Sequence, residues 1–219
     1  MLALTFSTGV IDAVGYLGLD RVFTGNMTGN VVILGMAIAG GDGLPVLGPT
    51  IALGGFMLGA SLGGRYLRTA APGWSHRHSR AFGLVGVLLV LTAGVLLTTS
   101  LLGADAGQQR QVSALAITGT MAASMGLQAA AARKLGLKDL TTVVVTSVIT
   151  GLSADSRLGG GHRQPWQRRV AAVVLIAAGA ATGALLLRWH LGLGVLLAGV
   201  IALVVAAVGE ADRRAIVVR

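Results

Sequence analysis

Apolar residues run along the chain in eight segments, which short polar or basic loops separate. The segments cover roughly residues 1–19, 24–40, 46–64, 81–103, 112–132, 140–154, 170–187 and 191–209. A helix needs about 20 apolar residues to cross the hydrocarbon core of a bilayer. The pattern therefore predicts an all-α polytopic membrane protein with about six transmembrane helices.

Two of the eight segments do not read as ordinary spanning helices. The segment 140–154 is short and rich in Thr and Ser, and the segment 24–40 begins with a polar run from Thr24 to Asn30. Broken or re-entrant helices are tolerated in a membrane only where protein or a water-filled cavity surrounds them. We expect these two segments to be half-helices of this kind.

The basic residues discriminate between topologies, because cytoplasmic loops carry an excess of Lys and Arg. If all eight segments cross, the 17 basic residues divide 8 to 9, which is no bias. If both irregular segments are re-entrant, only Arg21, Arg110 and Arg188 lie outside, and 14 residues and both termini are cytoplasmic. If only 140–154 is re-entrant, Arg21 changes side, which gives 15 to 2, seven spans and an external N-terminus. The last two models stay open.

An internal repeat favours the symmetric model. The motif Phe56-x-x-Gly59-Ala60-x-x-Gly63 recurs 120 residues later as Ile176-x-x-Gly179-Ala180-x-x-Gly183. Further pairs correspond at offsets of 118 and 116: Thr24 with Thr142, Thr28 with Thr146, and Asp12 with Gln128. We expect two membrane repeats of opposite topology, 1–103 and 110–209, followed by a cytoplasmic tail, 210–219. Transporters and channels of this plan bind their solute at the midplane between the repeats.

The composition agrees with a membrane location. Only 11% of the residues are charged, against about 25% in an average soluble domain. The net charge of +9 is explained by the basic loops, so we expect the lipid bilayer as a partner and no nucleic acid. The chain has no cysteine, which excludes disulfides and thiolate metal sites. We expect no metal and no cofactor.

Asp12 is the first candidate for a functional residue, because a carboxylate within an apolar segment usually lines a path or a site. It could exchange a proton and couple transport to it, or contact a cation. It could equally cap the broken backbone of segment 24–40. Both interpretations remain open.

Further polar residues of both halves could line the same site. Asn26 and Asn30 are spaced i, i+4. A half-helix that starts here would direct its N–H groups at the membrane interior, where they could hold an anion or a polar solute. Alternatively, the asparagine side chains could simply cap these N–H groups. In the second half Gln128 must find a hydrogen bond, whereas threonines often bond to their own helix. The predicted substrate-binding residues are Asp12, Thr24, Asn26, Thr28, Asn30, Gln128, Thr142 and Thr146. Small residues predicted to let helices pack closely are Gly55, Gly59, Gly63, Gly179 and Gly183.

These same motifs resemble the YoaK-type family of bacterial inner-membrane proteins of unknown function. The resemblance rests on Gly9-Val10-Ile11-Asp12-Ala13-Val14-Gly15-Tyr16 and Phe23-Thr24-Gly25-Asn26-Met27-Thr28-Gly29-Asn30, and it continues in Met125-Gly126-Leu127-Gln128 and Thr141-Thr142-Val143-Val144-Val145-Thr146. The chain departs from the family pattern at Ala129 and Ser147. The resemblance implies a multi-pass protein of the bacterial inner membrane and gives no substrate.

The function that we expect is a small transporter or channel for an unidentified small solute or ion. The alternative is a non-transporting assembly or sensor subunit. An intramembrane enzyme is disfavoured, because the chain contains no Gly-x-Ser-x-Gly, no His-Glu-x-x-His and no Cys. Small channels commonly associate, so we also expect a homo-oligomer.

Overall fold

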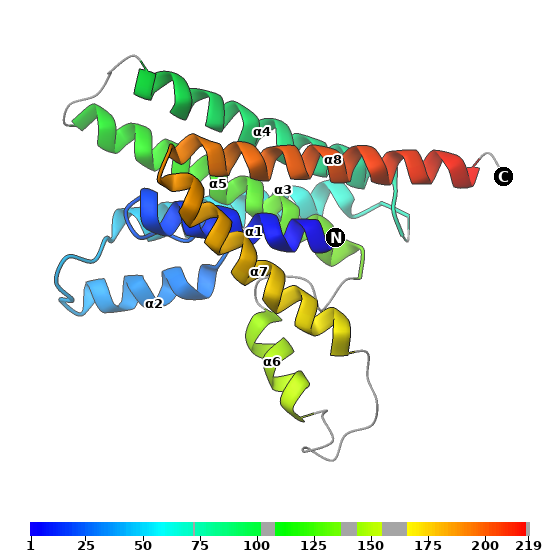
Figure 1. The fold of residues 1–219 in the computed structure, drawn as a ribbon, viewed down its shortest axis with the longest axis horizontal. Coiled ribbons are helices and arrows are strands. Elements are labelled where there is room, and N and C mark those ends of the chain that lie inside the picture. The colour runs from blue at the N-terminus through cyan, green and yellow to red at the C-terminus, as the bar shows by residue number, and fades with distance from the viewer. Residues whose placement is uncertain (72, 102–107, 137–143, 155–165, 218–219) are drawn as a thin grey trace.

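The computed structural model describes residues 1–71, 73–101, 108–136, 144–154 and 166–217, and these ranges contain eight α-helices and no strand (Figure 1). In chain order the helices are α1 (Leu2–Gly18), α2 (Met27–Ile38), α3 (Leu47–Leu67), α4 (His76–Leu101), α5 (Gln108–Lys134), α6 (Val144–Ala154), α7 (Trp166–Leu187) and α8 (Leu191–Val217). The prediction of an all-α fold is confirmed.

Five of these helices, α3, α4, α5, α7 and α8, are long and apolar enough to cross a membrane. The apolar helices α1 and α2 are shorter, with 17 and 12 residues. At 1.5 Å per residue α1 is about 25 Å long and α2 only about 18 Å, against a hydrocarbon core of about 30 Å. The large apolar side chains that remain exposed, such as Leu58, Leu91 and Val204, face outward from these helices as lipid would require. The chain is a polytopic membrane protein.

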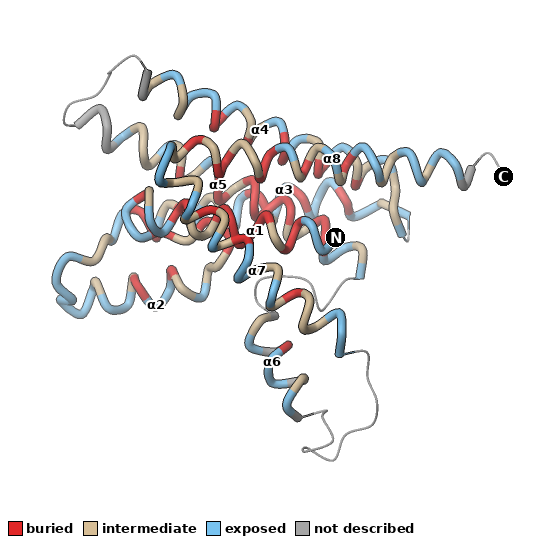
Figure 2. The backbone as a smooth tube through the Cα atoms, in the orientation of Figure 1, coloured by how far each residue is buried: buried red, intermediate tan, exposed pale blue. Residues whose placement is uncertain are grey.

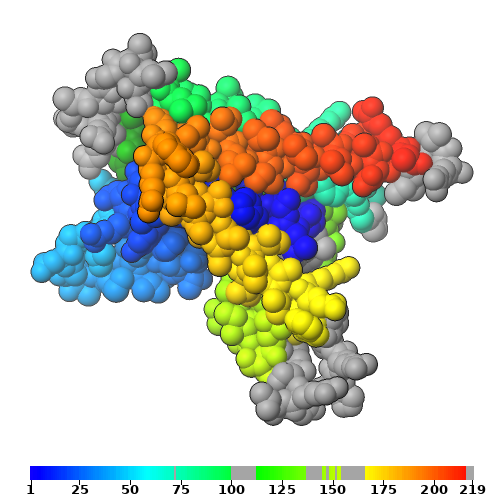
Figure 3. Space-filling view, in the orientation of Figure 1, coloured from blue at the N-terminus to red at the C-terminus, as the bar shows by residue number. Residues whose placement is uncertain are grey.

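The core forms where α1 lies among its neighbours. α1 packs along α7 and also contacts α8, and in the space-filling view it is visible only in part between these two helices (Figure 3). Buried positions follow the central helices, while the outer faces are exposed (Figure 2). The buried cluster joins five helices and includes Ile11 of α1, Leu89 of α4, Met121 of α5 and Val195 of α8.

The two halves of the chain use the same helix pairings. α1 packs on α7 as α5 packs on α3, and α1 contacts α8 as α5 contacts α4. α2 lies on α3 as α6 lies on α7. α4 packs along α8, its own counterpart. Exchanging the four helices of the first half for the four of the second therefore leaves these pairings unchanged.

Glycines bring the paired helices into backbone contact. A Cβ atom on Gly9 would collide with the backbone of Ile176 and Ala180, and a Cβ on Gly126 would collide with Phe56 and Ala60. The predicted packing glycines lie at the same two helix contacts: Gly55, Gly59 and Gly63 face α5, and Gly179 and Gly183 face α1. The absence of a side chain is what allows these backbones to approach.

Replacing Gly59 by alanine should destabilise the fold, because the new Cβ would overlap the backbone of Ala123 and force α3 away from α5. We expect a loss of roughly 1–3 kcal/mol, as for other overpacked contacts. The measurement is the midpoint of thermal unfolding in detergent, followed by circular dichroism. Gly54→Ala is the matched control, since nothing lies within 4 Å of its Cβ position on the same helix. Equal midpoints for the two variants would contradict this packing.

Candidate functional site

The chain turns back along α1 directly after this helix ends. Asp20 and Arg21 both adopt positive φ angles, 57° and 56°, which are uncommon for residues other than glycine. The reversal brings the backbone of Val22 against Gly15. The following residues therefore run beside α1 in the opposite direction until α2 begins.

Asp12 binds the backbone just before α2. Its Oδ1 atom accepts hydrogen bonds from the N–H of Gly25, at 2.7 Å, and of Asn26, at 3.3 Å. A Cβ on Gly25 would lie 3.1 Å from the Cγ2 atom of Thr8 and 3.3 Å from Asp12 Oδ1, so a larger residue would be pressed against both. The carboxylate thus supplies an acceptor to N–H groups that no helix turn can satisfy.

The two asparagines of the polar run also bind backbone. Asn26 is the N-cap of α2, and its side chain accepts from the N–H of Gly29 at 3.3 Å. Asn30 is fully buried and clamps Phe23 on both sides, since Oδ1 accepts from the N–H at 2.9 Å and Nδ2 donates to the carbonyl at 2.5 Å. These contacts hold the unwound segment in place, as the capping interpretation predicts.

Gln128 of α5 joins the same cluster through Thr8. Its Nε2 donates to Thr8 Oγ1 at 3.3 Å, and the Thr8 hydroxyl donates to the carbonyl of Leu4 at 2.9 Å. Four buried side-chain atoms have no hydrogen-bond partner within the described part of the chain, and two of them, Gln128 Oε1 and Thr24 Oγ1, belong to this cluster. Buried polar atoms are normally paired, so these two need an explanation.

The structure brings together five of the eight predicted binding residues: Asp12, Thr24, Asn26, Asn30 and Gln128. Thr28 is exposed on α2, and Thr146 is exposed on α6. Thr142 lies outside the described residues. Thr8 was not among the predicted binding residues, although a spacing of four residues places Thr8 and Asp12 on one face of α1.

The helix contacts shift the correspondence between the halves by one residue. Gly9 and Gly126 make equivalent contacts, with Ile176 and Phe56, which sets the offset between α1 and α5 at 117. Asp12 therefore corresponds to Ala129, and Gln128 corresponds to Ile11. The position that carries the carboxylate in the first half carries a methyl group in the second.

A bundle of long apolar helices with a polar cluster at a backbone break defines an integral membrane protein with a buried polar site. The chain belongs to the family described as "Protein of unknown function (DUF1275)", whose model matches residues 1–209. It is 32% identical over 153 residues to the UPF0700 transmembrane protein YoaK of Bacillus subtilis (strain 168). The aligned region covers 69% of this chain and 64% of that relative. No solved structure matches. The resemblance to YoaK-type proteins is confirmed.

Asn30→Ala should destabilise the protein, because it leaves the N–H and the carbonyl of Phe23 without partners. We expect a loss of about 2 kcal/mol or more from these two backbone groups. The measurement is thermal unfolding in detergent. Thr28→Ala, at an exposed position two residues earlier on the same helix, is the control and should behave as the wild type. A transition of Asn30→Ala that coincides with the control would refute the clamp.

Proposed function

We propose that the protein is a small transporter or channel of the bacterial inner membrane, with its solute site at the backbone break beside Asp12. The observation that carries this proposal is the cluster itself. A chain that crosses lipid has strong reasons to keep its backbone helical, and irregular backbone is tolerated at depth only inside protein or beside a water-filled cavity. Small transporters place their sites at such breaks.

The geometry of α2 supports a re-entrant half-helix. Gly25 reaches the level of Asp12, near the middle of α1, and α2 begins two residues later. α2 then leads back toward the end of the bundle at which α3 starts (Figure 1). Gly48, in the first turn of α3, faces the side chain of Val22, just beyond the end of α1. On this reading α2 enters and leaves on one side of the membrane.

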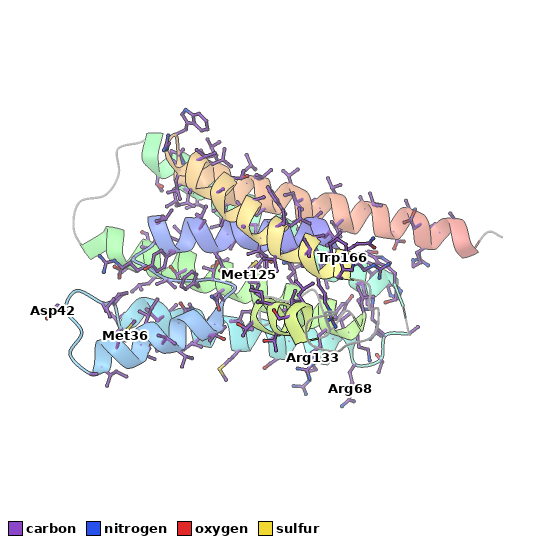
Figure 4. All side chains as sticks on the ribbon, turned by 60° about the horizontal axis from the view of Figure 1, so that its bottom comes forward. Met36, Asp42, Arg68, Met125, Arg133 and Trp166 are labelled. Carbon is purple, nitrogen blue, oxygen red and sulfur yellow. The ribbon has the colours of Figure 1, made fainter. Side chains whose placement is uncertain are left out.

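The opposite end of the bundle is basic, which supports a cytoplasmic assignment. Lys134 at the end of α5 donates to the carbonyl of Arg68 at the end of α3, and Ser79 of α4 donates to Glu210 of α8. Arg68 and Arg133 lie at this end and Asp42 at the other (Figure 4). Met1 lines a groove here with Trp74 and Gly209, so the start of α1 and the end of α8 would both be cytoplasmic.

The shared pairings of the two halves support an inverted repeat. A pseudo-twofold axis between α4 and α8 would relate α1 to α5 and the half-helix α2 to α6. Such an axis lies in the membrane plane in transporters built from inverted repeats, and their sites lie near it. Asp12, Thr8 and Gln128 come from both halves and meet at one place.

Asp12→Asn should separate a transport role from a structural one. Asparagine keeps an oxygen for the N–H groups of Gly25 and Asn26, so the fold should survive, whereas the charge and the exchangeable proton are lost. We expect uptake into proteoliposomes to fall by about tenfold or more. The probes are isotopically labelled guanidinium, urea and nitrate, measured against protein-free liposomes.

Two results would contradict a transport role of the Asp12 carboxylate. Unchanged uptake of the transported probe by Asp12→Asn would assign the carboxylate to capping alone. Loss of the thermal transition together with uptake would favour the structural role that an assembly or sensor subunit needs.

The re-entrant path of α2 predicts that residues on either side of it share one side of the membrane. Asp20 and Asp42 are exposed, and single cysteines at both positions should react with a membrane-impermeant maleimide in intact cells. A cysteine at Arg68 should be protected until the cells are permeabilised. The chain has no cysteine of its own, so it needs no prior substitution. Labelling of position 42 but not of position 20 would instead support seven spans.

A further inference from the structure

The polar atoms around Asp12 point to the chemical class of the solute. We infer that the solute is a small molecule or ion whose N–H groups donate hydrogen bonds to oxygens of the site, and that the site rejects anions. This inference rests on the proposed transport function. It follows from which polar atoms of the cluster are already paired within the protein and which are left over.

The place at which an anion would bind is occupied by the protein itself. Free N–H groups and partial positive charge at a helix start normally attract anions. Here Asp12 Oδ1 accepts from Gly25 and Asn26, and Asn26 Oδ1 accepts from Gly29. A solute anion would have to displace a carboxylate. Residues 1–19, 24–40 and 112–132 contain no Lys or Arg that could stabilise it.

The orientation of the Gln128 amide follows from its neighbour. The Thr8 hydroxyl gives its proton to the carbonyl of Leu4, at 2.9 Å, so Thr8 Oγ1 can only accept from Gln128. The amide nitrogen must therefore face Thr8, and Oε1 is the atom left over. Gln128 is only 5% exposed, and an amide oxygen can accept but never donate.

The atoms that remain free around Gly25 are oxygens. Asp12 Oδ2 accepts neither the bond from Gly25 nor the bond from Asn26, although the N–H of Thr24 also lies against the carboxylate, and Oδ2 lies 3.5 Å from the Cβ position of Gly25. Thr24 is 0% exposed, and its hydroxyl, which can accept or donate one hydrogen bond, has no partner among the described residues. Buried acceptors are costly to leave unpaired. A solute that brings donors could pair with the buried oxygen Gln128 Oε1, whereas an anion brings only further acceptors.

The test is uptake of three planar probes of similar size by proteoliposomes. Guanidinium carries N–H donors and a positive charge, urea carries N–H donors without charge, and nitrate carries only acceptors. We expect guanidinium, urea or both to exceed the uptake of protein-free liposomes, and nitrate to remain at that background. The relative uptake of the first two then shows whether the site requires charge in addition to donors.

Two α5 variants make the test specific for the free acceptor. Gln128→Met removes the amide at similar length and leaves the bond from Thr8 to Leu4 intact. We expect it to lower uptake by about tenfold, as the loss of one hydrogen bond to a charged or polar solute would. Ser124→Ala is the matched control, because this buried hydroxyl bonds to Thr120 of its own helix, at 2.8 Å, one turn before Gln128. It should transport as the wild type does.

The outcomes separate this inference from the function on which it rests. Uptake of nitrate, with guanidinium and urea at background, would overturn the inference and leave the transport function standing. Background uptake of all three probes by protein with an intact thermal transition would contradict both. Wild-type uptake by Gln128→Met would remove Gln128 from the site.

Discussion

The need to satisfy backbone N–H and C=O groups away from water is the constraint on which this structure depends. A long helix satisfies its own backbone groups, and five helices of this chain are therefore able to cross a membrane with apolar side chains on their outer faces. The segment from Asp20 to Gly25 does not satisfy its backbone groups in this way, because it runs back along α1 outside any helix. Side chains bind backbone groups here instead: Asn30 binds both groups of Phe23, and Asp12 binds the N–H groups of Gly25 and Asn26.

This requirement explains why capping and function are hard to separate at Asp12. Asp12 binds the N–H groups of Gly25 and Asn26 through one oxygen, and its second oxygen makes neither of these bonds. Asn30 differs, since both ends of its amide are used by Phe23. The two residues lie in one cluster. The contacts thus distinguish Asn30, whose amide is used entirely to hold the loop, from Asp12, which holds the loop through one oxygen.

The sequence was sufficient for the fold class, because hydropathy reports directly on lengths of apolar helix. It also located the break, since Asn and Gly at the start of an apolar segment have no other ready explanation. It could not supply partners across the bundle. The bond between Thr8 and Gln128 joins residues 120 positions apart, and only the assembled bundle brings α1 and α5 close enough to form it. The sequence matches alone gave offsets between 116 and 120, whereas the equivalent contacts of Gly9 and Gly126 set the offset between α1 and α5 at 117.

The pairing of α4 with α8 has a consequence for how the two halves relate. A helix that packs against its own counterpart makes an isologous contact, the kind that holds two identical subunits about a twofold axis. On the proposed inverted repeat, this chain would correspond to a symmetric dimer whose subunits are joined by a peptide linker. Two halves of one chain need not remain identical, because each half has its own residue at every corresponding position and the two residues can change independently. Asp12 and Ala129 are such a position, at which one half carries a carboxylate and the other has none.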